Sequence, residues 1–413
     1  MKVIFLTMAP IEDINVREIY PDLLRYFVKQ GHLVYIVSPR DRRLGVKTYV
    51  KEDGQVNYMG VKTLNLQKTN VIEKGVGQVL VSSQFKNAIK KYWGNVSFDL
   101  ILYATPPITL QGVVQWLKKK NPQAMSYLML KDIFPQNAVD IGLMPKNGVK
   151  GILYKHFRRQ EKILYAISDY IGCMSPANVE YVLNHNPELS SDKVEEAPNS
   201  VELKERVLEP GQEKEERFYI RSKYDLPIDK PIFIYGGNLG KPQGIPFLID
   251  CLEVNKNRND CFFLIVGNGT EYEKIMEWED SSGASNVKIM RGLPKKEYHE
   301  LVRTCDVGLI FLDHRFTIPN YPSRVLSYME YKMPVLCATD PNSDMGRIAE
   351  DNGFGYWCES NSVEAFTAIL DKMITGDRKI MGERGYQYLK ENYLVENTYN
   401  AIMKHLTEDY NNK

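Results

Sequence analysis

Short apolar runs alternate with amphipathic segments along the first 200 residues of the chain. Val3–Thr7 and Leu33–Val37 are apolar runs, and Glu18–Gln30 between them places Leu23 and Phe27 at helical spacing. A helix that connects two continuous apolar strands is the βαβ unit of a parallel sheet. Further apolar runs follow at Asp99–Tyr103, Ala124–Leu130 and Tyr170–Met174. We therefore predict one Rossmann-like, doubly wound α/β domain over residues 1–200.

The same pattern restarts in the second half of the chain. Residues 202–217 are rich in Glu and Lys, which is typical of an exposed connector. Beyond them lie the apolar runs Ile232–Tyr235, Phe262–Val266, Val287–Met290, Val307–Phe311 and Pro334–Ala338. We predict a second parallel-sheet domain over residues 201–385, followed by an amphipathic helix at about 386–413 that packs back on the first domain. Because parallel sheets bind ligands at their carboxyl ends, two such domains facing a deep cleft suit a reaction between two substrates.

Charge is divided unevenly between the two halves. Residues 1–200 hold 26 Lys and Arg against 18 Asp and Glu, and the remainder holds 27 against 34, within a net charge of +1. This total gives no reason to expect a nucleic-acid-binding protein. The six cysteines form no CxxC pair and are expected to be buried thiols of a reducing cytoplasm. No apolar run approaches the length of about 18 residues that spans a membrane, so a cytoplasmic protein is expected.

The glycine-rich stretch Ile232–Ile245 carries the clearest signal of chemistry. A strand leads into Gly236 and Gly237, and a loop with Gly240 and Gly244 precedes a helix. Glycines let the backbone approach a ligand closely, and a helix N-terminus attracts phosphate. The stretch is neither a Walker A loop nor a GxGxxG motif. We predict a phosphate-binding loop, with an ordinary glycine-rich turn as the alternative.

A second segment, Asp313–Val335, places a cation at the start of a predicted helix. Ser323 is expected to cap this helix, and Arg324 lies in its first turn. A cation there opposes the helix dipole, which makes sense if Arg324 faces an anion. An arginine that points into solvent is the alternative.

These motifs occur in an order that resembles glycosyltransferase family 4, whose members have the GT-B fold. The C-terminal half carries Gly-Asn-Leu-x3-Gln-Gly at 237–244, Gly267-x-Gly269 and Pro-Ser-Arg-x2-Ser-Tyr-Met at 322–329. The N-terminal half carries Thr105-Pro-Pro107, Lys131-Asp-Ile-Phe-Pro135 and Leu164-Tyr-Ala-Ile-Ser-Asp169. The resemblance covers nearly the whole chain and is strongest to bacterial capsule and O-antigen transferases of the N-acetylfucosamine type.

The resemblance implies a sugar transfer that retains the anomeric configuration. The expected donor is a UDP-linked N-acetylated hexosamine or 6-deoxy-hexosamine bound by the C-terminal domain. The expected acceptor is a polyprenyl-diphosphate-linked saccharide bound by the N-terminal domain, in capsule or O-antigen synthesis. The chain has no Asp-x-Asp motif and no His-Glu-x-x-His motif, so neither a metal nor a cofactor is expected.

The resemblance also assigns roles to individual positions. Asp132, Lys241 and Arg324 are implied to be catalytic: Asp132 orients sugar or acceptor hydroxyls, and the two cations stabilise the leaving diphosphate. The residues implied to bind the donor are Gly237, Asn238, Gln243, Gly244, Gly267, Gly269, Arg291, Leu293, Ser323 and Glu330.

Several positions depart from the family pattern. Asn238 and Gln243 stand where many members have Arg and Lys, so Lys241 and Arg324 are expected to compensate. The paired glutamates of the family fall at Pro319 and Ser327. Glu330 is a candidate for the ribose contact instead, with a plain surface role as the alternative.

The departures leave two other functions open. One is an enzyme like a UDP-N-acetylhexosamine 2-epimerase, although only His314 among the histidines lies near the donor motifs. The other is a non-catalytic partner subunit of a transferase, which the missing glutamates suggest.

Residues 141–165 combine cations with apolar side chains. The cations are Lys146, Lys150, Lys155, Arg158, Arg159 and Lys162, against Glu161 alone. The interleaved apolar residues are Ile152, Leu153, Phe157, Ile163 and Leu164. Such a helix is typical of peripheral contact with an anionic membrane, here the inner face of the cell membrane. A helix packed on its own domain with a solvated basic face is the alternative.

Overall fold

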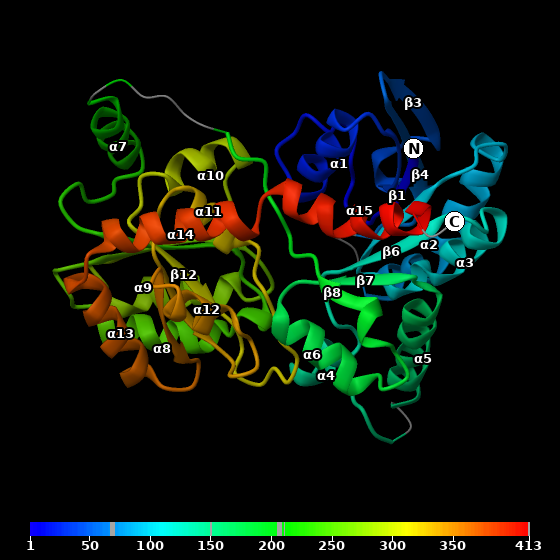
Figure 1. Cartoon of the computed structure of the whole chain (residues 1–413). Coiled ribbons are helices and arrows are strands. Elements are labelled where there is room, and N and C mark those ends of the chain that lie inside the picture. Colours follow the sequence, from blue (N-terminus) through cyan, green and yellow to red (C-terminus); the bar gives the residue numbers. More distant parts are fainter. Residues whose placement is uncertain (67–70, 149–150, 205–208, 210, 412–413) are drawn as a thin grey trace. The chain divides into compact units, whose positions relative to one another are not determined.

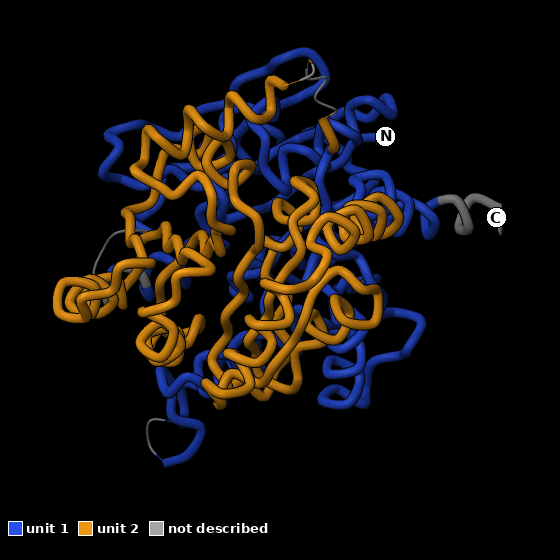
Figure 2. The backbone as a smooth tube through the Cα atoms, turned by 90° about the vertical axis from the view of Figure 1, so that its left-hand side faces the viewer, with its two compact units in different colours: residues 1–202, 394–413 blue, residues 203–393 orange. Residues whose placement is uncertain are grey.

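The protein consists of two compact units, each with its own sheet. The computed structural model describes residues 1–66, 71–148, 151–204, 209 and 211–411. Unit 1 comprises Met1–Glu202 and Leu394–Lys413, and unit 2 comprises Leu203–Tyr393 (Figure 2). The chain therefore returns to unit 1 at Leu394, rather than at the predicted residue 386.

Unit 1 is built on a sheet of eight strands in the order β3-β4-β2-β1-β5-β6-β7-β8. The strands are β1 (Lys2–Leu6), β2 (Leu33–Asp41), β3 (Tyr49–Asp53), β4 (Val56–Thr63), β5 (Leu100–Thr105), β6 (Met125–Leu130), β7 (Tyr170–Cys173) and β8 (Val194–Glu196). The helices are α1 (Ile19–Lys29), α2 (Val71–Tyr92), α3 (Gln111–Lys120), α4 (Gln136–Asp140), α5 (Gly151–Ile167), α6 (Pro176–His185) and α15 (Val395–Asn411). All pairs are parallel except β3 with β4. Helices α1 and α15 pack on one face, where Leu24, Phe27 and Ile402 join the core (Figure 1).

Unit 2 has six parallel strands in the order β11-β10-β9-β12-β13-β14. The strands are β9 (Ile232–Asn238), β10 (Phe262–Asn268), β11 (Val287–Arg291), β12 (Val307–Phe311), β13 (Val335–Thr339) and β14 (Gly355–Glu359). The helices are α7 (Gln212–Lys223), α8 (Ile245–Asn255), α9 (Tyr272–Ser282), α10 (Lys295–Val302), α11 (Arg324–Glu330), α12 (Met345–Asp351), α13 (Val363–Thr375) and α14 (Arg378–Asn392). Helices α8, α9 and α13 cover one face of the sheet, and α10 and α11 cover the other (Figure 1). The chain order reverses between β9 and β12, so the loops after these two strands meet at the point where such sheets bind ligands.

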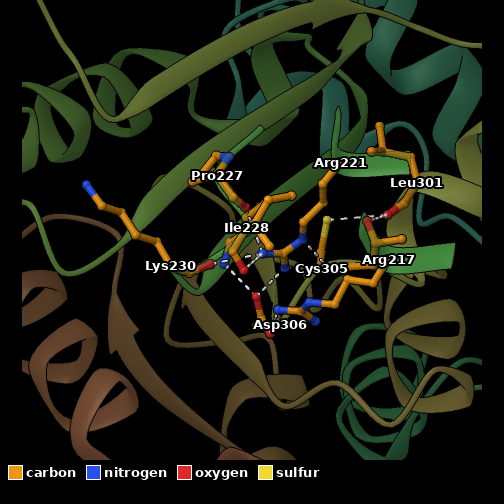
Figure 3. A network of polar contacts seen from close by, with 10 residues as sticks. Arg217, Arg221, Pro227, Ile228, Lys230, Leu301, Cys305 and Asp306 are labelled. Carbon is orange, nitrogen blue, oxygen red and sulfur yellow. Dashed lines mark hydrogen bonds and ion pairs between the residues drawn. The ribbon is translucent and has the colours of Figure 1, made fainter. Parts of the chain in front are cut away.

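Helix α7 corrects one part of the prediction that residues 202–217 form an exposed connector, because residues 212–217 are helical, although residues 212–215 are exposed as predicted. The helix begins at Gln212 and is fixed by Arg221, whose side chain is fully buried. Arg221 donates to the Asp306 carboxylate at 2.7 Å and to the carbonyls of Thr304 and Lys230 at 3.0 Å (Figure 3). The same carboxylate accepts from the backbone N–H of Ile232 at 2.7 Å. This network ties α7 to the amino ends of β9 and β12, away from the carboxyl ends where the candidate site lies.

The thiols and the helices bear on two further predictions. All six cysteines are buried and none forms a disulfide, which confirms the sequence-based expectation of buried thiols. Among the described helices, none combines the length and the apolar composition that crossing a bilayer requires.

Candidate functional site

The glycine-rich loop after β9 packs tightly against β10. A Cβ atom on Gly267 would lie 2.1 Å from the carbonyl oxygen of Gly237, and one on Gly269 would lie 2.1 Å from that of Leu239. Gly237 and Gly244 both have positive φ angles, at 129° and 59°. Only glycine fits these four positions without displacing the loop. Their presence is therefore required by the backbone path that carries the predicted phosphate-binding loop.

Arg324 lies beside this loop at the start of α11. A Cβ atom on Gly237 would lie 3.5 Å from the Arg324 guanidinium carbon, which itself lies 4.3 Å from the centre of the Tyr235 ring. The Nη1 atom of Arg324 is buried and has no hydrogen-bond partner among the described residues. A buried N–H donor without an acceptor is costly, so the Nη1 group of this half-buried guanidinium is suited to an anion next to Gly237.

Ser323 does not cap helix α11 as predicted. Its backbone is already helical (φ −61°, ψ −14°), and its side chain makes no capping hydrogen bond. A capping residue needs an extended backbone to bring its oxygen to the free N–H groups, and Ser323 lacks that conformation.

A pocket of about 340 Å³ opens next to the loop in unit 2. Its lining residues are Gly237, Asn238, Val266, Gly267, Asn268, Gly292, Leu293, Lys295 and Tyr298. The volume lies at the lower end of the range for small-molecule sites, about 300–1,000 Å³. Four predicted donor-site residues, Gly237, Asn238, Gly267 and Leu293, thus share one pocket, and Tyr298 adds an aromatic wall that the sequence analysis missed.

Other predicted donor-site residues lie outside this pocket lining. The side-chain oxygen of Gln243 accepts from Asn238 at 2.8 Å and from the backbone N–H of Gly240 at 3.2 Å, so it closes the loop. Arg291 stacks over Tyr272 at 4.5 Å and pairs with Glu273 at 3.2 Å. Lys241 is exposed on the loop, and Glu330 is half-buried at the end of α11.

Asp132 follows β6 at the carboxyl end of the unit 1 sheet. Burial raises the pKa of its carboxyl to about 6, against the opposing effect of the hydrogen bonds from Asn137. The Asn137 amide donates to both carboxylate oxygens, at 2.7 and 2.8 Å. The neighbouring Lys131 donates to the carbonyl of Ala197 at 2.7 Å, and burial lowers its pKa to about 7. Carboxyl ends of parallel strands with shifted pKa values are typical of functional sites.

The predicted basic helix corresponds to α5, and Lys150 lies outside the described residues. Arg158 turns inward, because it pairs with the buried carboxylate of Glu161 at 2.6 Å and donates to the carbonyl of His185. Arg158, one of the six cations of the predicted segment, is therefore only partly exposed.

The outer face of α5 nevertheless combines exposed apolar residues with cations. Ile152 and Leu153 on α5 are 65% and 52% exposed, and Leu143, which precedes the helix in the chain, is 60% exposed. Lys146 reaches over the ring of Tyr154 on α5, at 5.6 Å, which places it beside them. We call the following set the unit 1 basic patch: Leu143, Lys146, Ile152, Leu153, Lys155 and Arg159.

Over the part of the chain that the structure describes, no three His, Cys, Asp or Glu side chains gather as a group that could hold a metal ion.

Comparison with known proteins gives a family match in unit 2. Residues 216–388 match the model described as "Glycosyl transferases group 1". The chain is 23% identical over 337 residues to a probable glycosyltransferase, WbjE, of Pseudomonas aeruginosa, covering 79% of this chain and 78% of that protein. It is 24% identical over 153 residues to WcaI of Escherichia coli K12, a putative colanic acid biosynthesis glycosyl transferase, covering 36% and 37% of the two chains.

Solved structures match over the full length. Sucrose-phosphate synthase from Thermosynechococcus elongatus superposes with a TM-score of 0.76 at 12% identity, covering 100% of both chains. Anabaena Alr3699/HepE in complex with UDP superposes with a TM-score of 0.69 at 13% identity, covering 99% of this chain and 100% of that one. At such identities the likeness shows the fold alone, and it confirms the predicted GT-B fold. The match to the group 1 model covers residues 216–388 alone, and assignment to family 4 stays a prediction.

Proposed function

We propose that the protein is a retaining glycosyltransferase of family 4 that uses a UDP-sugar and needs no metal or cofactor. The sugar is an N-acetylated hexosamine or 6-deoxy-hexosamine. The acceptor is a polyprenyl-diphosphate-linked saccharide in capsule or O-antigen synthesis. The observation that carries this proposal is the half-buried Arg324, whose buried Nη1 atom has no hydrogen-bond partner among the described residues and whose guanidinium lies beside Gly237 at the edge of a pocket of about 340 Å³.

The proposed donor site divides between the pocket and the loop. The base and ribose occupy the pocket along Leu293 and Tyr298, and the diphosphate lies between Gly237 and Arg324. The bound UDP in the Anabaena structure supports a uridine nucleotide. Support for a role in polysaccharide synthesis comes from the similarity to WbjE and WcaI.

The reaction breaks the bond between sugar C1 and the donor phosphate oxygen and joins C1 to an acceptor oxygen. The acceptor proton passes to the departing phosphate, so that atoms and charge balance without a protein nucleophile. Arg324 and Lys241 stabilise the negative charge that develops on the diphosphate. Asp132, held by Asn137, orients the acceptor or sugar hydroxyls.

The unit 1 basic patch is the proposed contact with the anionic inner face of the cell membrane. Each Lys or Arg near such a surface contributes about 1 kcal/mol, and the exposed Ile152 and Leu153 can enter the lipid boundary. This contact would bring the enzyme to a lipid-linked acceptor.

Thermal unfolding with UDP, GDP and dTDP tests the donor assignment. UDP at 100 times its Kd is expected to stabilise the protein by about 2.7 kcal/mol, and GDP and dTDP by less at the same concentration. Arg324→Ala should abolish most of the UDP shift, because it removes a charge-assisted contact. Arg347→Ala is the matched control, since Arg347 is exposed on α12. An unchanged UDP shift in Arg324→Ala would overturn the diphosphate site.

Sugar transfer itself needs a second measurement. Incubation with UDP-N-acetylhexosamine and a polyprenyl-diphosphate disaccharide should give a lengthened lipid-linked product, detected by mass spectrometry. Formation of an epimer of the donor without acceptor would instead identify the epimerase alternative. No turnover by a protein that binds UDP would support a non-catalytic partner subunit.

A further inference from the structure

The guanidinium of Arg324 contacts Tyr235 rather than a carboxylate, through the face of the ring and through a hydrogen bond that it donates to the phenol oxygen. Its Cζ atom lies 4.3 Å from the centre of the Tyr235 ring, and Tyr235 is fully buried. Among the described residues, no Asp or Glu forms an ion pair with Arg324, and its Nη1 atom has no hydrogen-bond partner. Arg315 in the neighbouring loop is the contrast, because it donates to both oxygens of Asp313, at 2.9 and 2.7 Å.

The Tyr235 ring cannot move away from this position. Its hydroxyl donates to the carbonyl of Asn238 at 2.6 Å, inside the glycine-rich loop. On the other face of β9, the Tyr328 hydroxyl donates to the carbonyl of Ile234 at 3.2 Å and accepts from the N–H of Gly236 at 3.3 Å. The Tyr235 ring, which contacts Arg324, is therefore hydrogen-bonded to the same backbone that would line the proposed diphosphate site.

The two ways of holding an arginine have different consequences for an anionic ligand. A carboxylate neutralises the guanidinium and competes with a phosphate for its donors. An aromatic face attracts the cation through its quadrupole, by about 0.5–2 kcal/mol depending on exposure, and leaves the charge available together with the N–H groups that do not bond the Tyr235 oxygen, Nη1 among them. Only the second arrangement keeps a full positive charge next to Gly237.

We infer that Tyr235 is a positioning residue of the donor site, whose ring face holds the Arg324 guanidinium in place for the donor diphosphate. The inference rests on the proposed function. It explains how one half-buried arginine can serve a loop in which Asn238 and Gln243 stand in place of the two cations that many relatives of family 4 carry. Tyr235 touches Arg324 and the loop, and it acts on the substrate only through them.

Graded fluorination of the ring tests this role without changing its shape. Phenylalanine at 235 and its mono-, di- and trifluorinated forms carry a progressively weaker quadrupole. Tyr235→Phe also removes the hydrogen bonds of the hydroxyl, so it is the reference of the series, and the trifluorinated form is expected to bind UDP about tenfold more weakly than Tyr235→Phe, with intermediate steps between them. Isothermal titration with UDP measures the series, and the unfolding midpoint of each variant confirms that the fold is kept.

The same series in an Arg324→Gln background separates positioning from plain packing. With the cation removed, UDP affinity should be low and should not change with fluorination. Tyr386→Leu is the control for loss of a cation–π contact elsewhere in unit 2, since Lys332 lies 5.0 Å from the Tyr386 ring; it should leave UDP affinity unchanged.

Two results would count against different claims. A wild type that binds UDP, with affinity flat across the fluorinated series or falling equally in both backgrounds, overturns the positioning role alone. A wild type that binds no UDP overturns the proposed donor site, and the positioning role falls with it.

Discussion

The pKa of Asp132, raised to about 6 by burial, makes the proposed acceptor site sensitive to pH. If the carboxylate form orients the acceptor, kcat/KM should fall below about pH 6 as the group takes up a proton, by about tenfold per pH unit. Asp132→Asn should lower kcat at least tenfold at pH 8 and abolish this acidic limb. Initial rates with saturating UDP-sugar between pH 5 and 8 measure both effects.

Asn137 provides the test that this limb belongs to Asp132. Its amide hydrogen bonds lower the pKa of the carboxyl, so Asn137→Leu should move the limb toward higher pH. Gln123→Leu, at an exposed position of unit 1, is the control and should leave the pH of the acidic limb unchanged. If the pH of the acidic limb does not change in Asn137→Leu, the titrating group is not Asp132.

Gly267 offers a prediction about the loop itself. Gly267→Ala would place a Cβ atom 2.1 Å from the Gly237 carbonyl oxygen, so the donor loop must shift. Overpacking of this kind costs about 1–3 kcal/mol of stability, and we expect UDP affinity to fall at least tenfold. Gly283→Ala is the control, because its Cβ would meet nothing within 4 Å although its φ of +66° adds strain. Gly283→Ala should therefore lower stability and leave UDP affinity unchanged.

The sequence was informative at single residues wherever one residue type has one physical reason to be present. Gly237 and Gly267 could be predicted because few other residues allow such close backbone approach. Tyr235 and Tyr298 could not, because an aromatic residue in or after an apolar run is typical of any core. Arg291 and Gln243 were assigned to the ligand from the motif alone, yet their partners Glu273 and Asn238 lie within the protein.

Among the elements, the edge strand β11 was predicted, whereas the edge strands β3, β8 and β14 and the interior strand β4 were missed. Strands β1, β5 and β12 are apolar apart from Lys2 and Thr105 at their ends, since both of their faces are covered. Strand β3 is almost wholly exposed and reads Tyr-Val-Lys-Glu-Asp, which carries no apolar pattern. Its only signal is Asp53-Gly54 before β4, a turn typical of an antiparallel hairpin.

Helix α7 was missed because its anchor is polar. Arg221 is fully buried and pairs with Asp306 (Figure 3). Because Asp306 lies 85 residues further along the chain, no local sequence pattern predicts this contact. Removing one member of a buried ion pair costs about 3–5 kcal/mol. Asp306→Ala should therefore lower the free energy of unfolding by that amount in urea, whereas Asp260→Ala, at a more exposed carboxylate, should cost under about 1 kcal/mol. Equal costs would show that the network adds no stability.

The unit 1 basic patch predicts that the protein binds anionic membranes. Vesicles with 30% phosphatidylglycerol should bind the protein in low salt and release it at high ionic strength, because the attraction is screened. The double variant Ile152→Asp/Leu153→Asp should bind at least tenfold more weakly. Val254→Asp is the control, since Val254 is 64% exposed on α8 in unit 2. Equal binding by both variants would remove the unit 1 basic patch as the contact.

At the scale of the whole molecule, the division of charge follows the division into units. Unit 1 holds 28 Lys and Arg against 22 Asp and Glu, and unit 2 holds 25 against 30. The predicted split at residue 200 gave a larger contrast, because Glu202 and the acidic end of the chain belong to unit 1. The basic unit is the one that carries the proposed membrane contact, and the acidic unit is the one proposed to bind the anionic donor, through local groups such as Arg324.

Each unit has a hydrophobic core of its own, so we expect calorimetry to resolve two unfolding transitions. UDP at 100 times its Kd adds about 2.7 kcal/mol to the unit that binds it, which should raise one transition by about 5–10 °C and leave the other in place. Phe27→Ala, which empties part of the unit 1 core, should lower only the transition that UDP does not move. Asp306→Ala should lower the UDP-sensitive one, since Asp306 lies in unit 2. If UDP instead raises the transition that Phe27→Ala lowers, the donor lies in unit 1 and the assignment of the two substrates to the two units is wrong.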